Sequence, residues 1–232
     1  MSEQDAGQRG EQVAVHRIEF SVDWPPGHVA AYLVDCSEPI LFDAGMAGED
    51  AHEELVAGLA ESGYDLADID HLVVTHPHVD HIGQVPAIVE AADPDVYAPA
   101  GVGERFDRDP EELAETVERN AKAAGLRGEY LDEAIEMSVE SLERDGSLLD
   151  PEYVDHWVEG GTTSEIGPLA FETIHTPGHQ ADHLVFLTEL DGERRLFAGD
   201  MALANFRPVA MHTGFDDGYE EAIDAYYTGV DR

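Results

Sequence analysis

Basic residues are scarce in this chain of 232 residues. Twelve Lys and Arg stand against 51 Asp and Glu, which gives a formal net charge of −39, and Lys122 is the only lysine. No basic stripe is present to neutralise phosphates, which argues against nucleic acid as a natural partner. Self-repulsion of this kind weakens the compact state in dilute buffer. Because molar salt shortens the Debye length to about 3 Å, we expect a protein of a salt-accumulating cytoplasm, as in a halophile, rather than an ordinary acidic protein.

Cysteine and long apolar runs are also lacking. Cys36 is the single cysteine, which excludes an internal disulfide framework. No run approaches the about 18 apolar residues of a membrane-spanning helix, so no membrane association is expected. Residues 1–12 are polar and do not resemble a secretory signal, and a cytoplasmic location is therefore expected. Nothing in the sequence bears on the oligomeric state.

Apolar periodicity predicts a single α/β domain over residues 1–232. Apolar runs and alternation predict strands, and apolar residues spaced three or four apart predict helices. The expected strands are 13–22, 29–34, 40–42, 69–75, 96–98, 169–175, 183–188 and 195–198, and the expected helices are 51–62, 82–92, 111–124, 130–144 and 219–227. Residues 101–160 are predicted to be an acidic helical insertion. The order of sheet, helices and sheet indicates two sheets faced by helices.

A cluster of histidines carries the main chemical signal. Three of the 12 histidines fall in the sequence Thr-His-Pro-His-Val-Asp-His, just after a predicted strand. This H-x-H-x-D-H spacing supplies the potential ligands His76, His78, Asp80 and His81. Residues two apart share a face of an extended chain, so His76 and His78 can point at one metal. Asp80 and His81 fall at a helix start and can turn toward a second. Imidazole and carboxylate together suit zinc or iron better than magnesium.

Further candidate ligands stand just beyond other predicted strands. His179 follows strand 169–175 in Thr-Pro-Gly-His, and Asp200 follows strand 195–198 in Gly-Asp. Sites in α/β proteins commonly form beyond the carboxyl ends of strands. Asp43 ends an early strand in the same way, and we interpret it as an acid that fixes a ligand histidine.

The order of these segments resembles the metallo-β-lactamase superfamily. The resemblance rests on Asp43, then THPHVDHIG, then TPGH, then GD, and it covers about Val13 to Asp200. It implies an αββα sandwich of two similar halves. It also implies a set of metal ligands: for the first metal His76, His78 and His179, for the second Asp80 and His81, and bridging both Asp200.

The segment from Gly178 to His183 looks closest to the glyoxalase II and LACTB2-like branch. In that pattern His183 is more often structural than a ligand, and we place it with His212 at the rim of the site. The family normally supplies one more histidine after the bridging acid. The last candidate is His212, only 12 residues after Asp200. Three interpretations stay open, and the first is favoured: a natural chain that continues past Arg232 with this histidine and a last strand of the second sheet, a depleted second metal site, or His212 itself as the ligand.

The expected activity is hydrolysis of a small-molecule thioester, lactone or related ester, with Asp80 accepting a proton from the attacking water. Two zinc ions are the expected cofactors, because zinc lowers the pKa of its bound water to about 7. Two alternatives stay open: persulfide dioxygenase-like chemistry on one iron held by His76, His179 and Asp200, and phosphodiester or RNA hydrolysis. The full ligand set argues against a non-catalytic scaffold. The insertion over 101–160 either roofs the site or is a solvated acidic surface.

Overall fold

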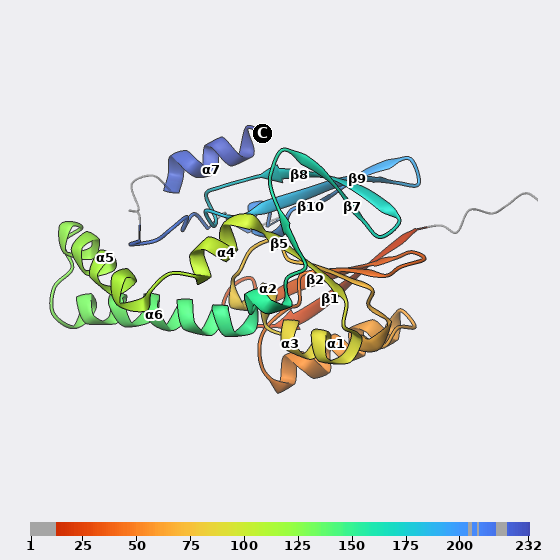
Figure 1. Cartoon of the computed structure of the whole chain (residues 1–232), viewed down its shortest axis with the longest axis horizontal. Coiled ribbons are helices and arrows are strands. Elements are labelled where there is room, and N and C mark those ends of the chain that lie inside the picture. The colour runs from red at the N-terminus through yellow and green to blue at the C-terminus, as the bar shows by residue number, and fades with distance from the viewer. Residues whose placement is uncertain (1–12, 204–205, 208, 217–221) are drawn as a thin grey trace, which may run out of the picture.

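The computed structural model describes residues 13–203, 206–207, 209–216 and 222–232. Within these residues the elements form two sheets with helices outside them, as Figure 1 shows. The two sheets lie face to face, and α1 and α3 cover the far side of the first sheet. The expected α/β architecture of two packed sheets is confirmed.

The first sheet has six strands in the described part of the chain. They are, in spatial order, β1 (Ala14–Ser21), β2 (His28–Asp35), β3 (Ile40–Phe42), β4 (His71–Val73), β5 (Asp95–Pro99) and β6 (His156–Val158). The pairs β1–β2 and β2–β3 are antiparallel, and the pairs from β3 to β6 are parallel. Parallel neighbours end at the same edge of a sheet, so the loops that follow β3 and β4 lie together there.

The second sheet is antiparallel throughout. Its strands, in spatial order, are β10 (Glu193–Phe197), β9 (Leu184–Leu190), β8 (Leu169–His175) and β7 (Thr162–Ile166). These are its four strands within the described residues, and the expectation of a further strand downstream stays a prediction.

Aromatic side chains fill the space between the sheets. Phe42 stacks on Phe197 with ring centroids 4.0 Å apart and lies 5.3 Å from Phe171 and 5.4 Å from Phe186. All four are buried. Burying an aromatic ring removes a large apolar area from water, so this cluster fixes the first sheet to the second beside the ends of β3 and β10.

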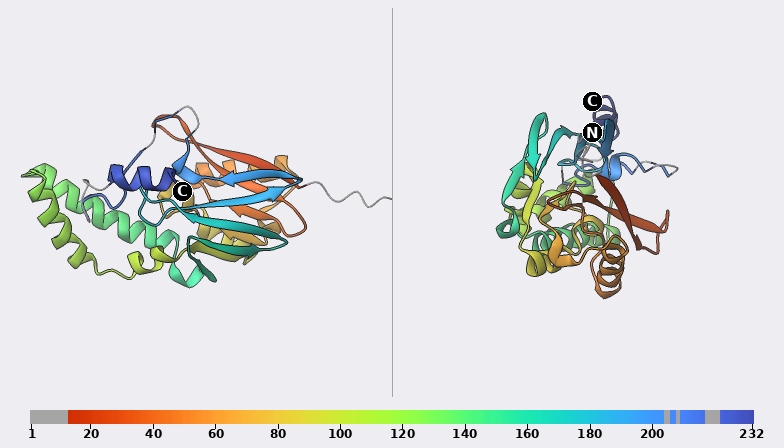
Figure 2. Two further views of the ribbon diagram at one scale, coloured as in Figure 1. Left: turned by 90° about the horizontal axis from the view of Figure 1, so that it is seen from above. Right: turned by 90° about the vertical axis from the view of Figure 1, so that its right-hand side faces the viewer.

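Helices close the other face of the first sheet and extend one end of the molecule. The helices are α1 (Glu49–Glu61), α2 (Val79–Ile82), α3 (Val85–Ala92), α4 (Ala100–Phe106), α5 (Pro110–Ala123), α6 (Glu129–Leu148) and α7 (Ala222–Val230), with short 3₁₀ turns η1 (Leu66–Asp68), η2 (Pro151–Tyr153) and η3 (Gly199–Met201). In Figure 2, α5 and α6 form a hairpin that projects beyond the sheets. The hairpin has a small core of its own around Leu113, Val117 and Leu142. None of the described helices has the length and apolar character needed to cross a membrane.

Several predicted boundaries are wrong. The insertion was expected to run from 101 to 160, but His156–Val158 is strand β6, which pairs with β5 in the first sheet. Strand β7 (Thr162–Ile166) was not predicted, because its residues are mostly exposed and polar. The helix expected over 82–92 is two helices, interrupted at Gly83 and Gln84. The helix expected over 219–227 is α7, and its first part lies outside the described residues.

Candidate metal centre

The chain leaving β4 brings most of the predicted ligands to one place. His76 is fully buried at the end of this strand. His78 is the N-cap of α2, and the single turn of α2 carries Asp80 and His81. The backbone N–H of Ala44 donates to the carbonyl oxygen of His81 at 2.6 Å, which holds α2 against the loop after β3.

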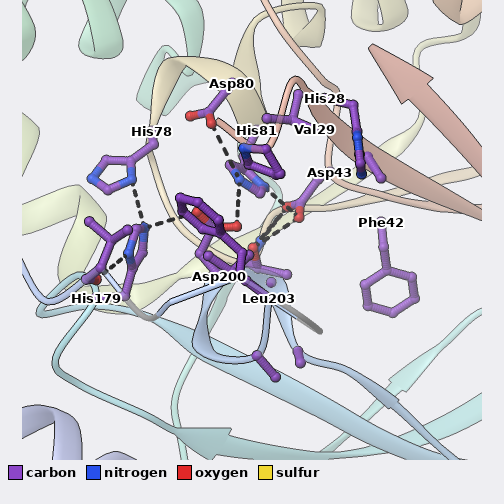
Figure 3. A pocket seen from close by; sticks show the side chains of 18 of the residues that line it. His28, Val29, Phe42, Asp43, His78, Asp80, His81, His179, Asp200 and Leu203 are labelled. Carbon is purple, nitrogen blue, oxygen red and sulfur yellow. Dashed lines mark hydrogen bonds and ion pairs between the residues drawn. The ribbon is translucent and has the colours of Figure 1, made fainter. Parts of the chain in front are cut away.

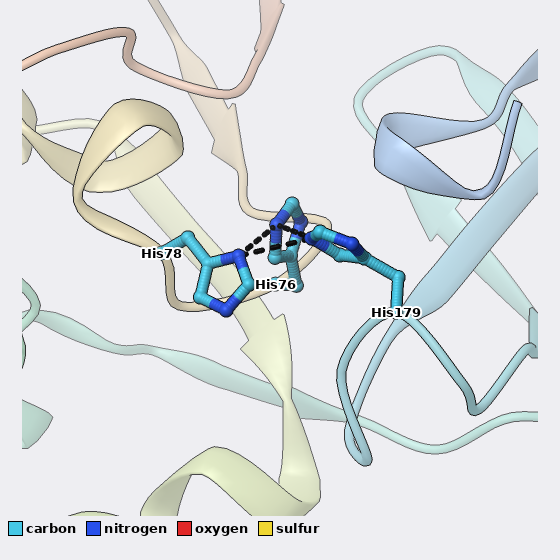
Figure 4. Close-up of side chains that lie close together, drawn as sticks. All are labelled: His76, His78 and His179. Carbon is cyan, nitrogen blue, oxygen red and sulfur yellow. Dashed lines mark hydrogen bonds between the residues drawn. The ribbon is translucent and has the colours of Figure 1, made fainter. Parts of the chain in front are cut away.

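His179 reaches the same place from the loop that follows β8. The Nε2 atom of His76 lies 3.0 Å from Nδ1 of His78 and 3.1 Å from Nε2 of His179, and the latter two nitrogens are 3.0 Å apart (Figure 4). A tetrahedral zinc ion with bonds of about 2.0–2.1 Å places its ligand atoms about 3.3 Å apart. The three imidazoles therefore fit one zinc ion and leave a fourth position open.

Hydrogen bonds leave the ligand nitrogens of these imidazoles free. Nδ1 of His76 donates to the hydroxyl oxygen of Thr75 at 3.0 Å, and Nδ1 of His179 donates to the carbonyl oxygen of Val209 at 2.8 Å, so each presents Nε2 unprotonated. Burial, followed by the charges of neighbouring histidines, holds the pKa values of His76 and His78 well below the ordinary value. Burial also lowers the pKa of His179. Metals bind neutral imidazole, so the triad is prepared for a metal at neutral pH.

Asp200, in η3 after β10, lies between this triad and a second group (Figure 3). Its Oδ2 atom is 3.4 Å from Nε2 of His179, and its Oδ1 atom is 3.2 Å from Nε2 of His81. Asp80 lies on the far side of His81, with its Oδ2 atom 3.9 Å from the same nitrogen. The ligand atoms of His76, His81 and Asp200 lie within 4.8 Å of one another. One carboxylate oxygen of Asp200 thus faces each group, as in a carboxylate that bridges two metals.

The electrostatics around His81 also favour a cation. Burial alone would lower the pKa of His81, but Asp43 and Asp200 raise it well above the ordinary value. Burial would raise the pKa of Asp200, but its contact with His81 and the nearby histidines lower it. Nε2 of His81 is buried without a hydrogen-bond partner in the described part of the chain. A proton or a metal ion at this nitrogen satisfies the facing carboxylates, so these residues fit a second metal.

Asp43 connects the two groups. Its Oδ2 atom accepts a hydrogen bond from Nδ1 of His81 at 2.9 Å, which leaves Nε2 of His81 as the ligand atom. Its Oδ1 atom accepts from the backbone N–H of Thr75 at 2.8 Å, and the Thr75 hydroxyl donates to the carboxylate at 3.0 Å. The same hydroxyl oxygen accepts a hydrogen bond from Nδ1 of His76. Asp43 therefore orients one histidine of each group, the role that the sequence indicated for it.

His183 is placed differently from the prediction. It was expected at the rim, but it is fully buried. Its Nδ1 atom donates to the hydroxyl oxygen of Thr176 at 2.9 Å, and its Nε2 atom accepts the backbone N–H of Asp200 at 3.2 Å. Burial holds its pKa well below the ordinary value, so it stays neutral and able to accept. His183 thus fixes the backbone of Asp200, which carries the carboxylate that faces both ligand groups.

His212 does not join either ligand group. Its backbone N–H donates to the carbonyl oxygens of Gly178 and His179 at 2.9 and 3.0 Å, and its side chain lines a cavity next to His78. Among the described residues, the sets that could hold a metal are those built on His76, His78, His179, His81 and Asp200. The interpretation of His212 as the missing ligand is therefore not supported.

The sequence also predicts that His71, His156 and His175, which lie outside the ligand motifs, are structural and away from the metals. His71 lies 3.2 Å from a carboxylate oxygen of Glu38, His156 stacks on Tyr97, and His175 contacts the carbonyl oxygen of Ala181 at 2.7 Å. None of the three belongs to a ligand group in the described residues.

A cleft of about 450 Å³ opens over the second group. Sequence reasoning missed several residues that shape it. Thr75 has no motif of its own, and its part in the relay to Asp43 depends on the tertiary fold. Arg17, from β1, and Arg144, from α6, also line the cleft, and lie far from the metal motifs in the sequence. The last of these shows that the helical insertion contributes to the wall of the site.

Comparison with known proteins shows the family to which this chain belongs. The model of the metallo-beta-lactamase superfamily matches residues 24–226. The chain belongs to this superfamily. It is 29% identical over 194 residues to the metallo-beta-lactamase fold-containing protein ST1585 of Sulfurisphaera tokodaii, covering 83% of this chain and 63% of that protein. It is 27% identical over 146 residues to a hydroxyacylglutathione hydrolase of Rhodopseudomonas palustris, covering 63% of this chain and 38% of the relative. The chain thus spans less than two thirds of the length of each of these two relatives.

Solved structures share the fold. The metallo-beta-lactamase family protein TTHA1429 of Thermus thermophilus matches with a TM-score of 0.69 and 24% identity, over 94% of this chain and 68% of that one. The class B3 di-zinc metallo-beta-lactamase LRA-12 from an Alaskan soil metagenome matches with a TM-score of 0.57 and 18% identity, over 95% and 71%. At these identities the likeness concerns the fold.

Proposed function

We propose that this superfamily member is a metal-dependent hydrolase that holds two zinc ions and acts on a small thioester, lactone or related ester. The observation that carries the proposal is the position of Asp200, whose two carboxylate oxygens lie 3.4 Å from the ligand nitrogen of His179 and 3.2 Å from that of His81. The hydroxyacylglutathione hydrolases among the relatives support a thioester as the first substrate class to test.

Each residue has a defined part in this reaction. His76, His78 and His179 would hold the first ion, and His81 and Asp200, with Asp80 beside them, would hold the second. The metal centre supplies a water of lowered pKa and a positive charge for the developing oxyanion. The Asp80 carboxylate, which lines the cleft, would accept the proton of the attacking water. Asp43 and Thr75 keep the imidazoles of His81 and His76 in the required tautomer.

The test is a substrate panel on the whole chain in molar KCl. Thioesters, lactones and phosphodiesters are offered to chelator-treated protein before and after zinc is restored. We expect zinc to restore thioester or lactone hydrolysis, because the ligand set matches zinc, and His156→Gln to behave like the wild type, because that residue lies outside the ligand groups. Phosphodiester hydrolysis alone, or activity that only iron restores, would favour one of the rival functions.

A further inference from the structure

A second cavity adjoins the metal centre on the side of the helical insertion. It has a volume of about 320 Å³ and lies between α4, α5, α6 and residues 211–216. We call it the helical pocket. His78 and Met211 line both this pocket and the metal cleft. The two spaces therefore adjoin at these side chains, and a molecule that occupied both would pass His78.

Positive charge gathers on the walls of these two spaces. Arg17 and Arg144 line the cleft, and Arg105 and Arg108 line the helical pocket. Four of the chain's twelve basic residues thus face the site. Acidic residues are few on the same walls. Among the described residues lining the two spaces, the acids are the metal-site carboxylates and one partner of an arginine, namely Asp43, Asp80, Asp200 and Asp216. In a chain of 51 acids, this distribution indicates a substrate that carries negative charge.

Arg105 is the cation best placed to receive that charge. No carboxylate lies within ion-pair distance of its guanidinium in the part of the chain that is described, and its polar neighbour is the side-chain amide of Gln180. Arg108, by contrast, pairs with Asp216, and Arg144 pairs with Asp145 at 2.8 Å. The charge of Arg105 acts to lower the pKa values of Asp182 and Asp145, but neither carboxylate forms an ion pair with it.

Two further polar groups of the same pocket lack a hydrogen-bond partner among the described residues. Nδ1 of His212 and the hydroxyl oxygen of Thr213 are buried without a hydrogen bond within the described residues. Buried polar atoms are nearly always paired with protein, water or ligand. Both residues line the helical pocket together with Arg105. The three groups could therefore serve a bound molecule with hydrogen-bonding oxygens.

The rest of the pocket wall is partly apolar, with the hydroxyl-bearing Ser138 and Ser141 among its polar residues. Its lining includes Leu113, Ala134, Met137, Leu142 and Phe215. The apolar part of this surface can pack against a short hydrocarbon chain. One guanidinium without a carboxylate partner matches a single negative charge, which favours a carboxylate over a phosphate dianion. Arg also binds carboxylate through two parallel N–H bonds.

We propose that the helical pocket binds a carboxylate at the far end of the substrate's acyl chain, so that the enzyme prefers esters or thioesters of short dicarboxylic acids. Arg105 holds the carboxylate, His212 and Thr213 complete its hydrogen bonds, and the methylene groups pack on the apolar wall. The inference rests on the proposed hydrolase function and names its substrate class. Arg105 is a substrate-binding residue in this account, and takes no part in breaking the bond.

The test compares thioesters with one neutral thiol, N-acetylcysteamine, and acyl groups that differ only in a terminal carboxylate. The glutaryl thioester carries the carboxylate, and the pentanoyl thioester does not. We expect the wild type to prefer the glutaryl thioester. A charge-assisted hydrogen bond of about 1.5–3 kcal/mol corresponds to about 10- to 150-fold in affinity. Arg105→Gln should lower kcat/KM for the glutaryl thioester by such a factor, mainly through KM, and leave the pentanoyl thioester within about twofold.

Matched variants separate this role from a structural one. Arg119→Gln removes a guanidinium from the exposed side of α5, which lines neither space, and should leave both substrates unchanged. Thr213→Ala should weaken the preference for the glutaryl thioester less than Arg105→Gln does. Arg105→Lys keeps the charge and should retain part of the preference if Arg105→Gln disturbs folding.

The possible results separate a failure of the carboxylate pocket from a failure of the proposed hydrolase function. Equal hydrolysis of both thioesters by the wild type, or a preference that survives in Arg105→Gln, would overturn the inference and leave the hydrolase intact. If neither thioester is hydrolysed, the proposed substrate class fails, and calorimetry with free glutarate then tests the pocket alone. Glutarate binding that Arg105→Gln abolishes would support the pocket, and no binding to the wild type would overturn it.

Discussion

At the scale of single residues, Asp43 is the side chain that joins both metal-binding groups. It accepts hydrogen bonds from His81 directly, and reaches His76 through the hydroxyl of Thr75. Its backbone has φ 61°, a left-handed conformation that few residues other than Gly, Asn and Asp adopt readily. Position 43 therefore requires a residue that tolerates a left-handed φ and that carries a carboxylate. Asparagine tolerates this φ but has no carboxylate.

Asp43→Asn should weaken zinc binding by about 10- to 100-fold, because loss of a carboxylate behind a ligand histidine has that effect. The fold should remain, since asparagine tolerates the same φ. Competition with a fluorescent chelator measures the change. Asp93→Asn is the control, because Asp93 also has a left-handed φ, 49°, but ends α3 away from the ligand groups. Unchanged affinity in Asp43→Asn would rule out the role assigned to Asp43.

The buried histidines make the metal-free protein sensitive to mild acid. Burial holds the pKa values of four of them, His76, His78, His179 and His183, below the ordinary value, whereas the neighbouring carboxylates raise that of His81. A group whose folded pKa is lowered stays neutral in the folded chain, while the unfolded chain binds a proton below about pH 6.5. Four histidines have a lowered pKa and only one has a raised pKa. The free energy of unfolding should therefore fall as the pH drops through about 6.5, where histidines of the unfolded chain take up protons.

Chelator-treated protein in molar KCl should therefore melt at a lower temperature at about pH 6 than at about pH 7.5. This window lies above the range in which most carboxylates titrate, so the change reports histidines. His183→Asn should show a smaller drop between the two pH values. A melting temperature that is constant or higher at the lower pH would contradict the protonation states described for the site.

At the scale of secondary structure, the short helix α2 depends on one close backbone approach. The N–H of Gly83, just after α2, donates to the carbonyl oxygen of Gly45 at 2.8 Å. A Cβ atom at position 83 would fall on the backbone of Met46 and Ala47. Glycine is required here because the turn that carries Asp80 and His81 is pressed against the loop after β3.

Gly83→Ala should destabilise the protein by about 1–3 kcal/mol, the usual cost of forcing extra atoms into a packed region. It should also weaken metal binding, because α2 must shift. Gly146→Ala is the control, since a Cβ there, near the C-terminal end of α6, makes ordinary contact with Phe106 at 3.7 Å. That change should be neutral or stabilising. Thermal unfolding and chelator competition measure both effects, and wild-type behaviour of Gly83→Ala would contradict this packing.

The sequence predicts well those strands whose apolar pattern is contained in their own residues. Strands over 40–42 and 169–175 have the predicted bounds, since their apolar residues are continuous or alternate with polar ones. Strand β6 was missed because three residues, His156–Val158, carry little periodicity and are ordered by pairing with β5. The site shows the same division. The ligand motifs are contiguous in sequence, whereas the relay through Thr75 and the cation Arg105 depend on tertiary contacts.

At the scale of the whole molecule, the net charge of −39 is carried largely on exposed surface. Exposed acids such as Glu133, Glu136 and Glu140 follow one another along α6. Like charges of this kind repel in dilute buffer and are screened in concentrated salt. The acidic surface therefore opposes folding at low ionic strength, while the cores between and beneath the sheets favour it at any ionic strength.

The melting temperature should rise between dilute buffer and molar KCl. For a chain of this length, each kcal/mol of relieved repulsion raises it by about 2–4 °C, and we expect a rise of at least that size. Sucrose, an uncharged solute that stabilises by exclusion, should give a smaller rise. Equal melting temperatures in dilute buffer and KCl would contradict adaptation to a salt-rich cytoplasm.

The most direct test of the proposed dinuclear zinc centre is the number of zinc ions bound per chain, measured by elemental analysis after zinc loading and removal of the excess. We expect two zinc ions per chain in the wild type. His76→Ala and His179→Ala each remove a ligand of the first ion, so both variants should bind at most one and lose hydrolytic activity. A single ion per wild-type chain, a preference for one iron, or near-full zinc in either variant would contradict the proposed centre.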